Sequence, residues 1–179
     1  MKAFDQQKEK IYWIKIKDGA FVYWNGKEEE LYMEFTGVLT DVFFKQDEYQ
    51  GKQFEEALFT FIYWEEKYIL SMRCDTSYFR QFCNLIRNSI IGVEILVKPK
   101  METINGKKKG SIFVKQNDVW LKGFYTKKKP GDLPQAEIIE VGNQKIYNNY
   151  LQIEFWKAYL KDILQRSTQI DDPNNDLPF

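Results

Sequence analysis

The fold class depends on residues 67–98, KYILSMRCDTSYFRQFCNLIRNSIIGVEILVK, which predict a strand, a helix and another strand in that order. Apolar residues dominate 67–73, and residues 75–77 (Asp-Thr-Ser) supply a helix N-cap. Apolar residues then recur at helical spacing, so we expect a helix over 76–90. Residues 91–98 return to the aliphatic pattern of a strand.

Further strands are predicted on both sides of this unit. Upstream, residues 31–45 and 53–64 have strand character, and Gly37 inside the first suggests a bulge or a sharp bend. Downstream, residues 111–115 and 118–125 predict two strands, or one bent strand. Three strands, a helix and two strands follow the order of the five-stranded oligonucleotide-binding (OB) barrel, with its helix between strands 3 and 4. We therefore expect a mainly β protein with such a barrel.

Extensions flank the expected barrel. Residues 10–17 alternate between polar and apolar, which predicts a strand, and residues 20–24 predict a second one. Asp18-Gly19 between them is a turn signal, so we expect an N-terminal hairpin. Residues 149–165 predict an amphipathic helix. The expected organisation is an N-terminal extension over 1–30, the barrel domain over 31–130, a linker and C-terminal helix over 131–166, and a disordered acidic tail over 167–179.

Composition excludes several kinds of chemistry. The 179-residue chain has no histidine, which excludes histidine triads and histidine metal sites. Cys74 and Cys83 lack the spacing of a zinc site and are expected to be reduced thiols of a cytoplasmic protein. The polar N-terminus is not typical of a signal peptide, and no apolar run is long enough to span a membrane. We expect no metal and no cofactor.

Charge is distributed unevenly along the chain. The formal net charge is zero, with 26 basic and 26 acidic side chains, but residues 98–129 hold ten lysines against Glu102 and Asp118. Aromatic residues interleave with these lysines, and single strands are bound by cations that follow phosphates and by rings that stack on bases. The predicted nucleic-acid-binding residues are Lys98, Lys100, Lys107, Lys108, Lys109, Phe113, Lys115, Trp120, Lys122, Phe124, Tyr125, Lys127, Lys128 and Lys129. Lys107–Lys109 are expected on the loop between the last two barrel strands.

The last nine residues combine acidic and apolar groups. Aspartates at 171, 172 and 176 precede Leu177, Pro178 and Phe179. An apolar anchor beside a carboxylate suits a hydrophobic pocket with a basic rim on a partner. This tip resembles the acidic C-terminal tip of bacterial and bacteriophage single-stranded DNA-binding proteins.

The resemblance implies a non-enzymatic protein that coats single-stranded DNA and recruits replication, recombination or repair proteins through its tip. It also implies the cytoplasm of a bacterial cell or a phage-infected host, and a possible homo-oligomer. The N-terminal hairpin, the C-terminal helix and the short tail depart from the usual bacterial pattern, which leaves the assembly open. The sequence leaves open the choice between DNA and RNA, and which rings stack and which fill the core.

Two other functions fit parts of the sequence. A protein-interaction module could use the tail and the aromatic surface without nucleic acid. A metal-dependent nuclease could use Asp47 with Glu65 and Lys67, which form a Glu-x-Lys. That motif is short enough to arise by chance in a chain with 29% charged residues, so we rank the nuclease last.

Overall fold

The computed structural model describes residues 10–170, with the side chains of residues 10–164. Eleven strands and two helices lie in this range. In chain order they are β1 (Ile11–Lys17), β2 (Ala20–Trp24), β3 (Glu29–Tyr32), β4 (Phe35–Tyr49), β5 (Lys52–Tyr63), β6 (Glu66–Arg73), α1 (Ser77–Ile86), β7 (Ile95–Ile104), β8 (Lys107–Gln116), β9 (Val119–Trp120), β10 (Glu137–Val141), β11 (Gln144–Asn148) and α2 (Tyr150–Ile170).

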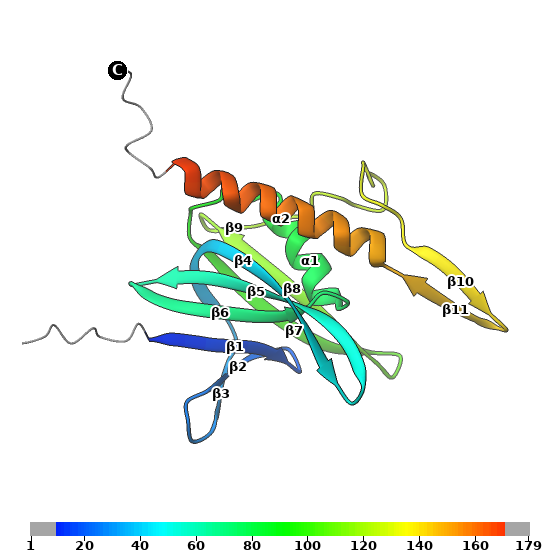
Figure 1. The fold of residues 1–179 in the computed structure, drawn as a ribbon, viewed down its shortest axis with the longest axis horizontal. Coiled ribbons are helices and arrows are strands. Elements are labelled where there is room, and N and C mark those ends of the chain that lie inside the picture. The colour runs from blue at the N-terminus through cyan, green and yellow to red at the C-terminus, as the bar shows by residue number, and fades with distance from the viewer. Residues whose placement is uncertain (1–9, 171–179) are drawn as a thin grey trace, which may run out of the picture.

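Nine of the strands form one open, mixed sheet. Its order is β3-β2-β1-β6-β5-β4-β7-β8-β9, so the N-terminal strands belong to the same sheet as the central ones. Every neighbouring pair is antiparallel except β1 and β6, which run parallel. β10 and β11 form a separate hairpin that projects beyond the sheet (Figure 1).

The longest pair is the β4–β5 hairpin. The strand predicted over 31–45 is two strands, β3 and β4, separated near Met33. The bulge lies between Leu39 and Asp41 rather than at Gly37. Gly37 instead permits close packing, because a Cβ there would lie 3.2 Å from the Cβ of Phe61.

The prediction of a closed five-stranded barrel is wrong. The strand–strand–strand–helix–strand–strand order is present over β4 to β8, but closure would require β6 and β8 to pair, and they do not. One reason is that β1 occupies the edge of β6, with partners from Ile11 and Lys67 to Lys15 and Ser71. The sequence contains no local pattern that predicts a pairing between strands more than fifty residues apart, whereas Asp18-Gly19 predicts the turn between β1 and β2.

The other reason is that α1 occupies the edge of β8. The side chains of Ser77 and Gln81 both donate to the Gly110 carbonyl, and the Ile112 amide donates to the Gln81 side-chain oxygen. A Cβ at Gly110 would lie 2.6 Å from the ring of Tyr78, so this close approach requires glycine. Side chains of α1 thus satisfy edge groups of β8 that a pairing with β6 would otherwise use.

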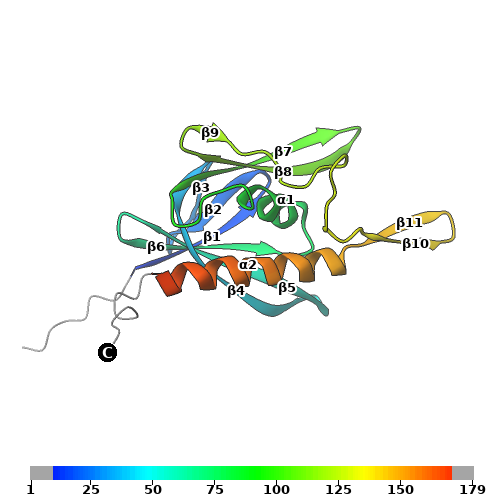
Figure 2. The same ribbon diagram turned by 90° about the horizontal axis from the view of Figure 1, so that it is seen from above.

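The core lies between the sheet and the two helices. Phe59 and Phe82 meet edge to face with centroids 4.9 Å apart, and both are fully buried. Figure 2 shows α1 between the β7–β8 hairpin and α2. Trp156 and Leu160 anchor α2 in the same core. Within this core α1 packs against β8, and α2 packs against β4 and α1.

The remaining differences from the sequence concern boundaries and one missed hairpin. α1 ends at Ile86 rather than at residue 90, and α2 extends to Ile170. Hairpin β10–β11 lies in the stretch expected as linker, with all its residues exposed except Asn148. Neither helix within residues 10–170 combines the length and apolar character needed to cross a membrane.

We predict that Gln81→Ala lowers the free energy of unfolding by about 2 kcal/mol, because it leaves groups at the β8 edge without their partners. Urea denaturation followed by circular dichroism measures the change. Gln46→Ala is the control, since Gln46 is exposed and should change stability by less than about 0.5 kcal/mol. Equal effects of the two substitutions would contradict the role given to Gln81.

Candidate nucleic-acid interface

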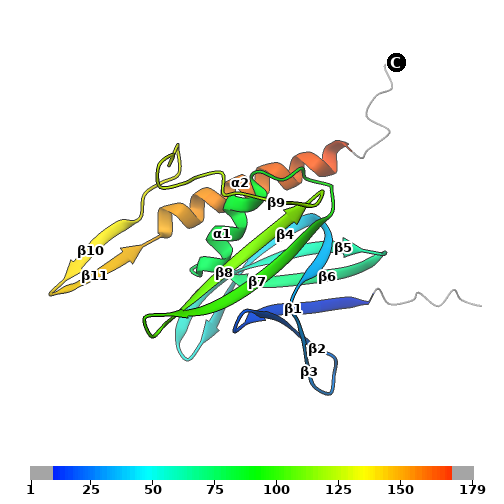
Figure 3. The ribbon, with the colours of Figure 1, turned by 180° about the vertical axis from the view of Figure 1, so that it is seen from behind.

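The candidate interface is the outward face of β7, β8 and β9, which lie side by side in Figure 3. Side chains alternate across a strand, and on β8 Gly110, Ile112 and Val114 are buried against the core. Lys107, Lys109, Phe113 and Lys115 therefore share the opposite face. The register adds Lys98 opposite Phe113, Lys100 opposite Ser111, and Trp120 opposite Lys115. We call this surface the lysine–aromatic face.

Two rings on this face are exposed. Phe113 is 43% exposed and Trp120 is 49% exposed, and their centroids lie 6.2 Å apart at an interplanar angle of 80°. The Lys115 ammonium lies 5.8 Å from the centre of the Trp120 ring. The face therefore presents two flat apolar surfaces flanked by Lys98 and Lys115.

Carboxylates accompany four of the predicted lysines. The pairs are Lys98 with Glu34 (3.7 Å), Lys100 with Glu102 (2.5 Å), Lys108 with Asp18 (2.8 Å) and Lys115 with Asp118 (3.4 Å). The Lys100 ammonium, by hydrogen bond and charge, lowers the pKa of Glu102, and Lys108 does the same for Asp18. Such exposed pairs contribute little to stability, so a phosphate can replace the carboxylate at low cost.

Lys107–Lys109 do not lie on a loop, as the sequence led us to expect. They begin β8 after the two-residue turn Asn105-Gly106 and pair with the end of β7. Alternation therefore divides them: Lys107 and Lys109 join the lysine–aromatic face, and Lys108 reaches Asp18 on the N-terminal hairpin.

The rest of the predicted stripe lies elsewhere. Residues 121–129 follow β9 and run along α1, where Asn84 bonds to both the amide and the carbonyl of Tyr125, and Asn88 donates to the Lys122 carbonyl. Phe124 is exposed but lies under the Arg87 guanidinium, 4.6 Å from its ring centre. Lys122 and Lys127–Lys129 are exposed on this second surface. The single basic stripe of the sequence is thus two surfaces.

Tyr125 is among the predicted nucleic-acid-binding residues, but it belongs to the core, so its ring is not available to stack on a base. It is 6% exposed, and its ring lies 5.8 Å from that of Trp156. Burial, with a hydrogen bond to Asp132, raises the pKa of Tyr125 to about 12. Alternation does not extend beyond β9, so sequence periodicity could not distinguish Tyr125 from Phe124.

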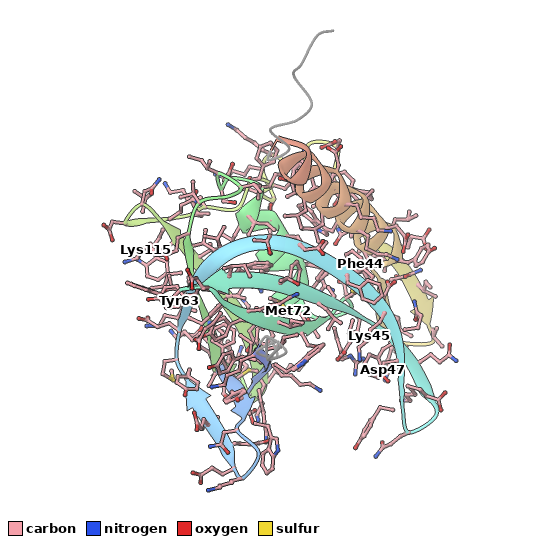
Figure 4. The ribbon with its side chains drawn as sticks, turned by 60° about the vertical axis from the view of Figure 1, so that its left-hand side comes forward. Phe44, Lys45, Asp47, Tyr63, Met72 and Lys115 are labelled. Carbon is pink, nitrogen blue, oxygen red and sulfur yellow. The ribbon has the colours of Figure 1, made fainter. Side chains whose placement is uncertain are left out.

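The carboxylates considered for a nuclease lie far apart. Asp47 pairs with Phe54 near the start of β5, whereas Glu65 follows the end of β5, about 30 Å away at the usual rise of a strand. Figure 4 shows Asp47 on the outer arm of the β4–β5 hairpin and Tyr63 at the opposite end of β5. Asp47 bonds to Lys45 instead. Within the described part of the chain, no three metal-ligating side chains of the His, Cys, Asp or Glu type come together.

Sequence reasoning missed a cavity of about 690 Å³ between the N-terminal strands and β4–β6. Its tyrosines include Tyr12, Tyr23 and Tyr68, and the last lies on a strand that the sequence analysis did not connect with the N-terminal hairpin. The parallel β1–β6 pairing brings them together, and no sequence pattern predicted that pairing.

The tail residues Asp171, Asp172, Asp176, Leu177, Pro178 and Phe179 lie outside the described residues. Comparison with known proteins adds no family: no family model, curated protein or solved structure matches the chain. The interface therefore rests on its own geometry.

We predict that Tyr125→Leu lowers the free energy of unfolding by about 3 kcal/mol, since it removes a buried ring and its hydrogen bond to Asp132. Phe113→Leu should change stability by less than about 1 kcal/mol, because that ring is exposed. Thermal or urea denaturation of both variants tests the assignment. It fails if Phe113→Leu is the more destabilising of the two.

Proposed function

We propose that this protein binds single-stranded DNA, with little sequence preference, through the lysine–aromatic face. The observation that carries the proposal is the placement of Phe113 and Trp120, both exposed, between Lys98 and Lys115 on one face of three adjacent strands. Rings stack on any base, with a contribution of about 1–3 kcal/mol each, and lysines follow the phosphates.

The same chemistry favours a single strand over a duplex. Bases in a duplex are already stacked on each other, so Phe113 and Trp120 gain nothing from them. A single strand can place bases on the two rings while its phosphates exchange with the carboxylates that now accompany Lys98 and Lys115. Counterion release then makes affinity fall steeply with salt.

The C-terminal tip supports a second role within the same function. Aspartates at 171, 172 and 176 and the apolar Phe179 suit capture by a partner protein with a basic-rimmed pocket. Tethered negative charges also compete with phosphate for the lysine–aromatic face through effective concentration. We propose that the tail both recruits replication or repair proteins and tunes DNA affinity. No catalytic step is part of this proposal.

We predict that labelled oligo-dT binds far more tightly than duplex of the same length in fluorescence anisotropy titrations. The affinity of the double variant Phe113→Leu/Trp120→Leu for oligo-dT should be lower by about 30-fold or more, because each ring contributes about 1 kcal/mol or more. The slope of log affinity against log salt concentration should become shallower by about one in each of the variants Lys98→Ala and Lys115→Ala.

Phe43→Leu is the control, because Phe43 is an exposed phenylalanine on β4, outside the lysine–aromatic face. A protein that binds dT no better than duplex, or a double variant that matches the control, would refute the proposed surface.

We predict that deletion of residues 171–179 tightens dT binding at low salt, and that the gain fades as salt screens the contact. Phe179→Ala removes the apolar anchor but no charge, so partner binding should fall while DNA affinity stays near wild type. Anisotropy measures the first effect and a pull-down with purified replication or repair proteins the second. A deletion that loosens DNA binding would contradict the competition, and full partner binding by Phe179→Ala would contradict the anchor.

A further inference from the structure

The missed cavity, which we call the tyrosine cavity, has the size of a small-molecule site. Its volume of about 690 Å³ falls within the usual range for such sites. Five tyrosines from β1, β2, β3, β5 and β6 line it: Tyr12, Tyr23, Tyr32, Tyr63 and Tyr68. Four of the five are only half-buried, so their rings are open to a ligand.

The parallel β1–β6 pairing builds the inner wall. Tyr12 and Tyr68 are direct partners across these strands, and their rings stack with centroids 4.7 Å apart and 12° between the planes. The Tyr23 ring lies 5.4 Å from that of Tyr12 at a tilt of 55°. Tyr12 and Tyr68 each cover one face of the other, so the wall offers a ligand their remaining surfaces together with the tilted Tyr23 ring.

Carboxylates lie in and beside the cavity: Glu30 and Glu34 line it, and Glu66 bonds to two of its tyrosines. Glu66 accepts hydrogen bonds from the Tyr12 hydroxyl (2.8 Å) and the Tyr68 hydroxyl (2.7 Å), and these bonds lower the pKa of Glu66. Glu30 accepts from Tyr32 and from the Asn25 amide, which lowers its pKa as well. Both carboxylates are ionised at neutral pH, and the hydroxyl and amide groups that donate to them are neutral.

A cation already lies at this site. The Lys10 ammonium is 4.5 Å from the centre of the Tyr12 ring. Ring faces attract cations through their quadrupole, and neighbouring carboxylates add to that attraction. An anion would be repelled by Glu30 and Glu34, which line the cavity, and by Glu66, which is bonded to Tyr12 and Tyr68, whereas a neutral ligand would gain nothing from these charges. The chemistry of the cavity thus selects for positive charge.

We propose that the tyrosine cavity binds an organic cation, an ammonium group on an alkyl chain, which takes the place of the Lys10 ammonium over Tyr12. This activity goes beyond DNA binding, because the cavity carboxylates repel phosphate. The ammonium group can belong to a free small molecule or to a lysine side chain of a protein, and both present the same chemistry to the cavity.

The test is a titration followed by amide chemical shifts in NMR spectra, with no DNA present. The probes are choline, a lysine capped at both backbone ends, and 3,3-dimethylbutan-1-ol, the neutral isostere of choline. Choline should shift amides of β1, β2 and β6 and bind at least fivefold more tightly than the neutral isostere. Tighter binding of the capped lysine would identify a protein source, and tighter binding of choline a free ligand.

Three variants separate the proposal from nonspecific attraction. Lys10→Gln should tighten choline binding about two- to tenfold, since it removes the competing ammonium from the rings. Lys27→Gln is the matched control, because Lys27 is an exposed lysine of the β2–β3 loop that does not line the cavity. The affinity of this control variant for choline should stay within twofold of wild type. Glu66→Gln should weaken binding at least fivefold and keep the hydroxyl partners of the native side chain.

Equal binding of the neutral isostere, shifts away from β1, β2 and β6, or an unchanged affinity in Glu66→Gln would each overturn the proposal. A Tyr68→Leu variant provides a second test if Glu66→Gln fails to fold, and it should weaken choline binding to a similar extent. None of these outcomes depends on DNA binding, so failure here and failure of the lysine–aromatic face are distinguishable.

Discussion

The structure depends on which groups bond to the edges of β6 and β8, the two strands that would have to pair to close a barrel. Gln81 and Ser77 of α1 bond to the edge of β8, and β1 pairs in parallel with the edge of β6. Unpaired strand edges are the groups with which sheets extend or close. Because a helix takes one edge and a distant strand takes the other, β6 and β8 cannot meet, and the sheet stays open. The separation of the molecule into two candidate sites follows from this arrangement.

Each side of the open sheet has a different chemistry. The β7–β8–β9 side carries lysines and two exposed rings, and its carboxylates pair with those lysines at the surface. The β1–β6 side carries tyrosines whose hydroxyls donate to the Glu66 carboxylate. Lys98 and Glu34 bond to each other at the border. One surface is suited to phosphates and bases, and the cavity is suited to a cation.

The sequence predicted the local elements well and the long-range pairings poorly. Asp18-Gly19 predicted the first hairpin, and Thr76 caps α1 as expected, because turns and caps are local. The sequence could not show that Tyr12 faces Tyr68, since their contact depends on a pairing between strands more than fifty positions apart in the chain. It also grouped Lys122 and Lys127–Lys129 with Lys98, although the chain turns away along α1 after Trp120. The sequence shows how many lysines residues 98–129 contain, but only the strand register of β7, β8 and β9 shows which of them lie on the same face.

The central claim is that single-stranded DNA lies on the lysine–aromatic face. Ultraviolet cross-linking of bound oligo-dT, followed by mass spectrometry of the peptides, tests it most directly, because a stacked thymine reacts with the ring that it touches. The account predicts cross-links at Phe113 and Trp120, lost when unlabelled dT competes. Cross-links confined to other aromatic residues, such as Trp13 or Trp64, or their absence under conditions of saturated binding, would contradict it.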